Sequence, residues 1–131
     1  MALKPVNHAG VWLLPEVRDP VTGRIDAKKL ARVLGVKQAQ LARALGVDRR
    51  VLASKPTLPR IQSRASLLER ALAILVDYLG SEEAARAWFH APNPNLEGRT
   101  AWEVCEDVQH YPQGLETVVR IVERVPRGIP S

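Results

Sequence analysis

The residues of this sequence best suited to specific chemistry are polar and basic side chains between positions 37 and 55. Arginine can form paired hydrogen bonds with a guanine edge, glutamine can do so with adenine, and lysine or serine can hold a phosphate. These residue types on short helices predict contact with DNA. The candidate DNA-binding residues are Lys37, Gln38, Gln40, Arg49, Arg50, Ser54 and Lys55.

Three short helices are predicted to position these side chains, with Asp26 and Asp48 as N-terminal caps and Gly35 and Gly46 as stops. A helix, a short turn with glycine and a second helix together form a helix-turn-helix, whose second helix enters the major groove. We expect the small residues Ala42 and Gly46 to let the two helices approach closely. The predicted ranges are Ala27–Leu34, Lys37–Leu45 and a third helix from Asp48 toward Ser54.

The spacing alone also fits a helical bundle whose arginines only face solvent, and the charge distribution helps to choose between the two. Residues 1–64 hold 13 Lys and Arg against 4 Asp and Glu, whereas residues 65–131 hold 6 against 10. A basic first half joined to an acidic second half indicates two surfaces with different partners. We therefore assign polyanion binding, to operator DNA, to the first half.

Composition restricts the remaining possibilities. A chain of 131 residues with 46% hydrophobic and 25% charged residues is ordinary globular protein, folded as one domain or as two small helical ones that share a core. No apolar run approaches the roughly 20 residues needed to cross a bilayer, and no secretory signal is apparent, so we expect a cytoplasmic protein without a membrane partner. One cysteine and three scattered histidines predict no metal site and no cofactor.

The second half predicts four more helices, and no segment of the chain predicts a strand, so the fold class is all-α. Ser63–Leu79 has a wide apolar stripe that includes Tyr78 and Leu79 and should be the core helix. The others are Ala84–His90 after the cap Ser81, a short helix opened by the capping box of Thr100 and Glu103, and Gln113 to about Val125.

Prolines and glycines divide the chain into three predicted regions. Residues 1–24 are an irregular N-terminal arm, residues 25–60 are the helix-turn-helix region, and residues 61–131 are a helical domain for partner binding or dimerisation. Pro56 and Pro59 predict a hinge or linker at the second boundary. The apolar residues of the arm, 11–14, either pack back on the body or cover a partner.

Nothing in the sequence forms a catalytic constellation, so an enzyme is not expected. Acidic residues at 82, 83, 103, 106 and 107 are explained by helix capping and dipole effects, and no nucleophile or phosphate loop accompanies them. The aromatic residues Trp88, Phe89 and Trp102 are interpreted as core at a helix corner more readily than as a ligand cage. Cys105 is interpreted as a small core residue.

An ordered set of short motifs runs through the second half: Leu79-Gly80-Ser81, then Ala84, Ala85 and Trp88, then Pro92-Asn93-Pro94-Asn95-Leu96 and Gly98-Arg99-Thr100, then Val118, Ile121 and Gly128. In this order the segment from about Arg64 to Ile129 resembles the toxin-binding domain of the Xre, MbcA and ParS antitoxin family. The family usually joins this domain to an Xre-like helix-turn-helix, which matches the first half. The sequence departs from the family at Ala101, where many relatives have proline, and in its proline-rich tail.

The resemblance implies an antitoxin of a type II toxin–antitoxin system whose partner is a RES-domain toxin that consumes NAD or transfers ADP-ribose. It implies that the C-terminal helix and tail help to close the toxin's active site, and that the chain represses its own operon, as a homodimer on a palindromic operator. The toxin-binding residues that it nominates are Trp88, Asn93, Arg99, Arg120, Arg124, Arg127, Gly128, Ile129 and Ser131.

A second interpretation stays open. The chain could be a plain Xre-like transcriptional regulator whose C-terminal helices only dimerise, in which case the acidic balance serves solubility and no toxin partner exists.

Overall fold

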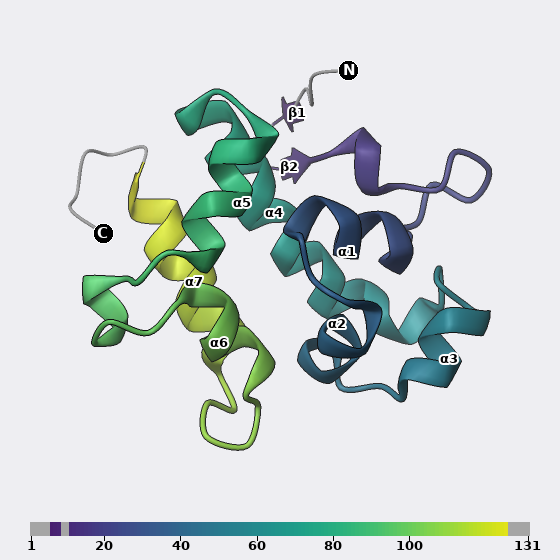
Figure 1. Ribbon diagram of the computed structural model, residues 1–131. Helices are drawn as coiled ribbons and strands as arrows, with labels where there is room; N and C mark the ends of the chain where they lie inside the picture. The colour runs from purple at the N-terminus through teal and green to yellow at the C-terminus, as the bar shows by residue number, and fades with distance from the viewer. Residues whose placement is uncertain (1–5, 9–10, 126–131) are drawn as a thin grey trace.

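The computed structural model describes residues 6–8 and 11–125, in which seven α-helices account for most of the structure. Figure 1 shows α1 to α3 gathered on one side of the molecule and α5 to α7 on the other, with α4 running behind them. The predicted all-α fold class is confirmed. The helices are α1 (Ala27–Leu34), α2 (Gln38–Leu45), α3 (Arg49–Ser54), α4 (Gln62–Leu79), α5 (Glu82–His90), α6 (Ala101–Glu106) and α7 (Gly114–Arg124).

Helix ends follow the caps that the sequence predicts. The carboxylate of Asp26 accepts a hydrogen bond from the backbone N–H of Lys28 at 2.8 Å, and that of Asp48 accepts one from Arg50 at 2.7 Å. Gly35 and Gly46 end α1 and α2 in the left-handed conformation, with φ of 70° and 72°. The expectation that Gly46 permits close helix approach is wrong, because a Cβ there would meet no atom within 4 Å. Its backbone conformation is what requires glycine.

Helix α4 is the centre of the core, as its apolar pattern predicts. Every residue from Ala71 to Val76 is buried, so this part of the helix is covered on all sides, and α5 and α7 both pack against it. Its last turn differs from the prediction. Tyr78 and Leu79, assigned to the apolar stripe, are 53% and 39% exposed. The helix extends past the elements that cover it, and its end therefore meets solvent.

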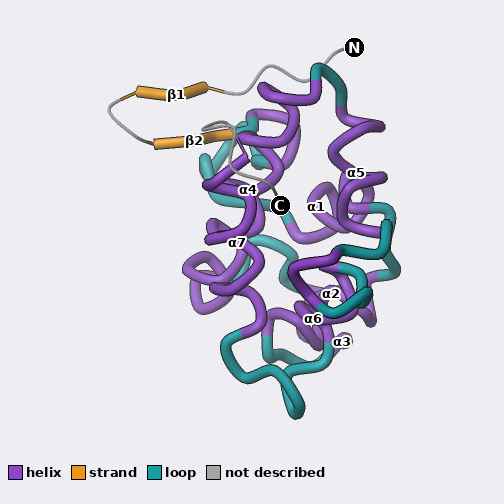
Figure 2. Tube along the Cα trace, turned by 90° about the vertical axis from the view of Figure 1, so that its left-hand side faces the viewer, coloured by secondary structure: helices purple, strands orange, loops and turns teal. Residues whose placement is uncertain are grey.

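The N-terminal region contains a short antiparallel hairpin that the sequence analysis did not predict. Strand β1 (Val6–His8) pairs with β2 (Val11–Leu13) in the register Val6 to Leu13. Figure 2 shows the hairpin at one edge of the helical body, and β2 contacts α4. Three residues are too few to display the alternation by which strands are recognised. Leu14, just before the 3-10 turn Pro15–Val17, and Val17, inside it, are both fully buried. This part of the arm therefore packs on the body.

A buried carboxylate fastens the arm to α4. Glu69, only 1% exposed, accepts hydrogen bonds from the backbone N–H of Leu14 at 3.0 Å and from Arg18 Nε and Nη2 at 2.8 and 2.7 Å. The hydrogen bonds to Glu69 raise the pKa of Arg18 above its ordinary value. Such a paired, fully bonded geometry is the condition under which a buried charge is tolerated.

The predicted linker is hydrogen-bonded to the start of α1 and packed into the core. The carbonyl of Pro56 accepts a hydrogen bond from Ala27 N at 2.8 Å, and Ile61, which precedes α4, is fully buried. One hydrophobic cluster contains residues of every helix from α1 to α7. A hinge between two independent bodies is therefore not what the structure shows around Pro56.

Side chains of α4 and α5 also bind the C-terminal ends of α1 and α2. Arg86 Nε donates to the carbonyl of Val33 at 3.0 Å, His90 Nε2 lies 2.8 Å from that of Leu34, and Arg64 Nε donates to that of Ala44 at 3.0 Å. Carbonyls at a helix C-terminus carry partial negative charge and favour cationic donors. The helix-turn-helix region is thus docked on α4 and α5 by these ends.

Candidate functional site

Three of the predicted DNA-binding residues lie together. Gln38 at the start of α2 and Arg49 and Arg50 at the start of α3 line one shallow hollow of about 260 Å³, with Ala39 and Ala53 between them. All three polar side chains are exposed. Two guanidinium groups and a carboxamide on the first turns of adjacent helices are suited to contact a base edge and the neighbouring backbone phosphates of DNA.

The other four predicted DNA-binding residues are placed differently. Lys37 and Lys55 are exposed at the ends of α2 and α3, and the hydroxyl of Ser54 donates to the carbonyl of Val51 at 3.3 Å. Gln40 has a structural role: it accepts a hydrogen bond from Lys37 N at 2.9 Å and donates to Glu106 of α6 at 3.1 Å. Gln40 therefore faces the second half of the chain, not the shallow hollow.

In the second half, residues 92–100 form a closely bonded loop around Asn93. Asn93 is 4% exposed, its side chain accepts from Asn95 N at 2.9 Å, and its backbone carbonyl accepts from Leu96 N and Gly98 N. Its own N–H donates to the carbonyl of Arg99 at 3.0 Å. Because Asn93 is buried, we assign it the role of shaping the loop that presents Arg99.

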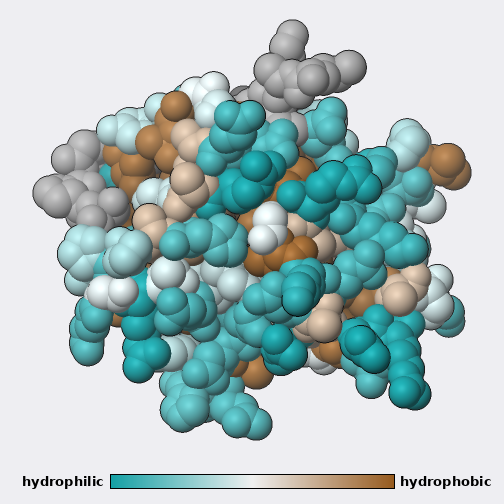
Figure 3. Space-filling model, in the orientation of Figure 1, coloured by the Kyte–Doolittle hydropathy of each residue, from teal (hydrophilic) through white to brown (hydrophobic). Residues whose placement is uncertain are grey.

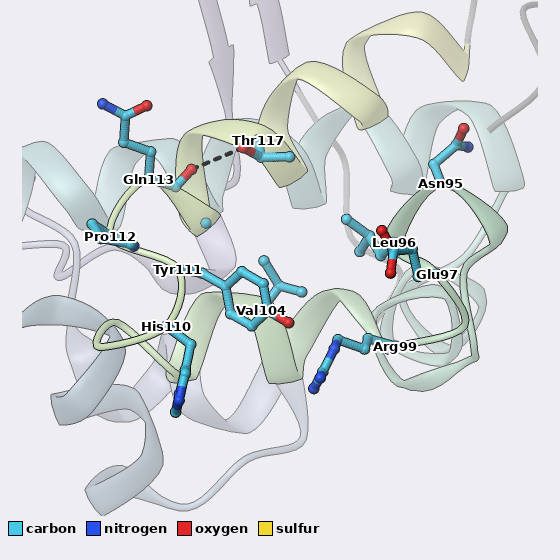
Figure 4. A pocket seen from close by; sticks show the side chains of 11 residues that line it. Asn95, Leu96, Glu97, Arg99, Val104, His110, Tyr111, Pro112, Gln113 and Thr117 are labelled. Carbon is cyan, nitrogen blue, oxygen red and sulfur yellow. Dashed lines mark hydrogen bonds between the residues drawn. The ribbon is translucent and has the colours of Figure 1, made fainter.

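This loop forms one wall of a pocket of about 400 Å³, and the start of α7 with the residues before it forms another. We call it the Arg99–Tyr111 pocket. The guanidinium of Arg99 lies over the ring of Tyr111, with Cζ 5.5 Å from the ring centroid. Figure 4 shows Leu96 and Glu97 across the open space from Tyr111 and Val104. Cation–π contact and apolar walls make this pocket suited to a protein side chain. The pocket residues used below are Leu96, Arg99, Val104, Tyr111, Gln113 and Thr117.

One face of α7 extends from this pocket. Gln113, Thr117, Arg120 and Arg124 follow each other at steps of four, three and four residues, which places them on the same side of a helix. Arg120 and Arg124 are exposed, while the opposite face, with Val118 and Val122, is buried. The structure therefore aligns three of the nominated arginines, at 99, 120 and 124, along one surface. The nominated Arg127, Gly128, Ile129 and Ser131 lie outside the described residues.

Trp88 lies partly buried against the core. Its ring makes an edge-to-face contact with Phe89, with centroids 5.5 Å apart and an interplanar angle of 82°. Phe89 and Trp102 are buried. The interpretation of these aromatics as core is confirmed for Phe89 and Trp102, whereas Trp88 is partly exposed.

Sequence reasoning missed Tyr111, Leu96 and Thr117 as pocket residues. They come from three separate segments that the backbone brings together only in the folded chain. The one signal available was the loop motif itself, because a proline- and asparagine-rich segment with a defined shape usually presents a particular side chain.

The acidic residues have the structural roles predicted for them, with two exceptions, Glu106 and the C-cap residue Asp107 at the end of α6. Glu82, Glu83 and Glu103 lie in first turns of α5 and α6. Glu106 ends α6, so the first-turn explanation is wrong for it; its carboxylate accepts hydrogen bonds from Trp102 Nε1 at 2.8 Å and from two residues of α2. Among the described residues no group of His, Cys, Asp and Glu could hold a metal ion.

In that part of the chain, too, no helix is long and apolar enough to span a membrane.

Cys105 is a core residue, as predicted. It is 1% exposed, and burial raises the pKa of its thiol to about 12. The protonated thiol is therefore favoured in the folded state, and its contribution to stability is present below about pH 9 and is lost as the pH rises toward 12.

We expect Cys105 in the native protein to be almost inert toward a disulfide thiol reagent at pH 8. A pKa near 12 in place of 9.0 lowers the reactive thiolate fraction about a thousandfold, and burial adds a barrier to access. The reaction should be followed by absorbance, with the chain in urea as the fully reactive control. Equal rates in the presence and absence of urea would contradict this placement of Cys105.

Gly114 permits the close contact between α6 and α7. A Cβ at this position would lie 2.3 Å from the carbonyl oxygen of Val104 and 2.9 Å from its Cγ1. We expect Gly114→Ala to lower the free energy of unfolding by about 1–3 kcal/mol, because backbone has to move. Urea denaturation would measure this, with Gly80→Ala as the control. At Gly80 only the left-handed backbone opposes alanine, since there is open space around it, so a Gly114→Ala cost no greater than that of Gly80→Ala would argue against the steric explanation.

The molecular surface shows no large apolar area on the face seen in Figure 3, where hydrophobic side chains appear in small separate groups among hydrophilic ones. A partner of this face would therefore meet a mainly polar surface, which is ordinary for an interface that is not permanent.

Comparison with known proteins gives a match in the second half of the chain. The family model of the antitoxin Xre/MbcA/ParS C-terminal toxin-binding domain matches residues 71–128, a range that contains the whole Arg99–Tyr111 pocket. A comparison with curated proteins found no match.

Among solved structures, the fold is similar to a chain of the M. tuberculosis MbcT–MbcA toxin–antitoxin complex. The TM-score is 0.53 with 16% sequence identity, over 80% of this chain and 94% of that chain. At this identity the likeness shows the fold, and it extends beyond the range of the family match. In the family comparison, residues 71–128 are thus similar to the C-terminal toxin-binding domain of Xre/MbcA/ParS antitoxins.

Proposed function

We propose that this chain is the antitoxin of a type II toxin–antitoxin system. Its second half binds a RES-domain toxin that consumes NAD or transfers ADP-ribose, and it blocks the active site of that toxin. Its first half binds operator DNA as part of a homodimer and represses the operon in the cytoplasm. The chain itself is not an enzyme.

The observation that carries the proposal is the family match over residues 71–128, which describes a toxin-binding domain. The solved structure with a similar fold is likewise a chain of a toxin–antitoxin complex. Within the matched range, the Arg99–Tyr111 pocket and the exposed Arg120 and Arg124 lie along one surface. Guanidinium groups on that surface are suited to acidic toxin groups or to a site that holds a pyrophosphate.

DNA binding is supported by the hollow that Gln38, Arg49 and Arg50 line, and by the excess of basic residues in the first half. With the C-terminal ends of α1 and α2 docked, Gln38 at the start of α2 and Arg49 and Arg50 at the start of α3 remain exposed. This is the arrangement in which a helix-turn-helix meets the major groove.

The proposal is tested by co-expressing the full chain with the product of the adjacent open reading frame. We expect a stable complex on purification, and a fall in cellular NAD together with toxicity when the neighbour is expressed alone. A complex without any effect of the neighbour on NAD would contradict the proposed toxin chemistry. No complex and no toxicity would contradict the antitoxin function and favour a plain transcriptional regulator.

A further inference from the structure

A second groove lies between the helix-turn-helix region and the toxin-binding domain. We call it the interdomain groove; its volume is about 640 Å³, and its walls include Arg43 of α2 together with Arg99, Glu103, Glu106, Asp107 and Val108. Arg99 also lines the Arg99–Tyr111 pocket, so the two hollows adjoin at this residue. The groove therefore continues the surface of the matched domain onto α2, which lies outside residues 71–128.

Hydrogen bonds to Glu106 hold the Arg43 side chain in this groove before any partner binds. Its Nε donates to Glu106 Oε2 at 2.9 Å, and its Nη2 donates to the same oxygen. The other oxygen of Glu106 accepts from Gln40 and Trp102. The Arg43 side chain is nevertheless 60% exposed, whereas that of Glu106 is 20% exposed. A side chain that is both ordered and accessible loses little conformational entropy when a partner binds.

The charges of the groove indicate which kind of partner fits. Three carboxylates, at 103, 106 and 107, face two guanidinium groups, at 43 and 99, so the groove as a whole repels a polyanion such as DNA. A protein segment can carry both acidic and basic side chains and can therefore pair with both kinds of charge in the groove. Within the described chain, Arg99 has the ring of Tyr111 as its contact and no carboxylate partner. Val108, 37% exposed, adds an apolar side chain to the wall.

We propose that the interdomain groove is part of the toxin-binding surface, and that Arg43 and Arg99 together receive a carboxylate from a segment of the toxin. This rests on the proposed antitoxin function and goes beyond it, because it places a toxin contact on the helix-turn-helix region. A buried guanidinium–carboxylate contact of this kind is a frequent source of binding energy at protein interfaces.

The test compares variants of the full chain in binding to the product of the adjacent open reading frame, measured by calorimetry. We expect Arg43→Ala to weaken binding at least tenfold. The matched control is Arg32→Ala, which removes an exposed arginine of the same half, on α1 and outside the groove. It should change binding by less than about twofold, as expected for a distant rim charge. Equal effects of the two variants would overturn the proposal.

Two further variants separate contact from positioning. Glu106→Gln keeps Arg43 but weakens the hydrogen bonds that hold its guanidinium, so it should lose less affinity than Arg43→Ala. An equal or larger loss would mean that Arg43 and Glu106 only join α2 to α6 and that Arg43 does not contact the toxin. Val108→Arg fills the groove from an exposed position, and it should weaken binding at least tenfold even if Arg43→Ala proves unstable in a thermal melt. Unchanged binding by Val108→Arg would overturn the proposal.

Measuring DNA binding by the same variants tests whether the groove contacts DNA instead of the toxin. Arg43→Ala should change affinity for the promoter of its own gene no more than Arg32→Ala does; a selective loss of DNA binding with intact toxin binding would assign Arg43 to DNA instead. If the wild-type chain forms no complex at all, the proposed antitoxin function is contradicted, and this inference, which rests on that function, is contradicted as well. A wild-type complex that Arg43→Ala leaves unchanged contradicts this inference alone.

Discussion

Replacing Glu69 with alanine should lower the free energy of unfolding by about 3–5 kcal/mol, the loss typical when one partner of a buried ion pair is removed. Glu69 is 1% exposed and accepts hydrogen bonds from Arg18 and from the backbone N–H of Leu14. Without the carboxylate, both donors lose their acceptor, and the arm has no polar attachment to α4 at this point. Urea denaturation followed by circular dichroism measures the change.

The chain offers a matched control in Glu123→Ala. Glu123 also pairs with an arginine, Arg70, at 2.7 Å, but the two side chains are 36% and 32% exposed. An ion pair so open to water contributes about 0–1 kcal/mol. Glu69→Gln, which keeps a side-chain acceptor, should fall between the two. Similar losses for Glu69→Ala and Glu123→Ala would show that burial does not determine how much the Arg18–Glu69 pair contributes to the free energy of unfolding.

The contrast between these two glutamates also shows what the sequence can predict. Helices such as α1 and α3 were predictable because their caps, Asp26 and Asp48, act on backbone groups two or three residues away. The Arg18–Glu69 pair joins residues 51 positions apart, and no local pattern distinguishes Glu69 from an exposed glutamate. Local physics is visible in a sequence, whereas long-range pairing follows from the packing of the whole chain.

The candidate site divides in the same way. Gln38, Arg49 and Arg50 were predictable because their separation follows from a known turn between two helices. The partnership of Gln40 and Arg43 with Glu106 was not, because it depends on how α6 docks against α2. Asn93 was nominated from a motif as a contact, and its burial instead gives it the role of shaping the loop. A motif identifies the residues that matter without stating which of them remain on the surface.

Replacing Arg49 and Arg50 together with alanine should lower affinity for the promoter of the chain's own gene at least about thirtyfold. Each arginine that reads a base edge is worth roughly 1–3 kcal/mol, and two such losses at separate bases add. Both side chains are exposed, and the α3 cap depends on the carboxylate of Asp48 and a backbone N–H, which the substitutions retain. We therefore expect a folded protein, with binding measured by fluorescence anisotropy at fixed salt.

The matched control removes the same charge from the other surface. Arg120→Ala combined with Arg124→Ala should leave promoter binding within about threefold of wild type and weaken the complex with the adjacent gene product, whereas the Arg49 and Arg50 variant should keep that complex. The two variants have equal net charge, so any difference between them in DNA affinity reports position, not charge. Loss of both activities in either folded variant would mean that the two surfaces are not separate, and that the single core joining α1 to α7 transmits each substitution to the other half.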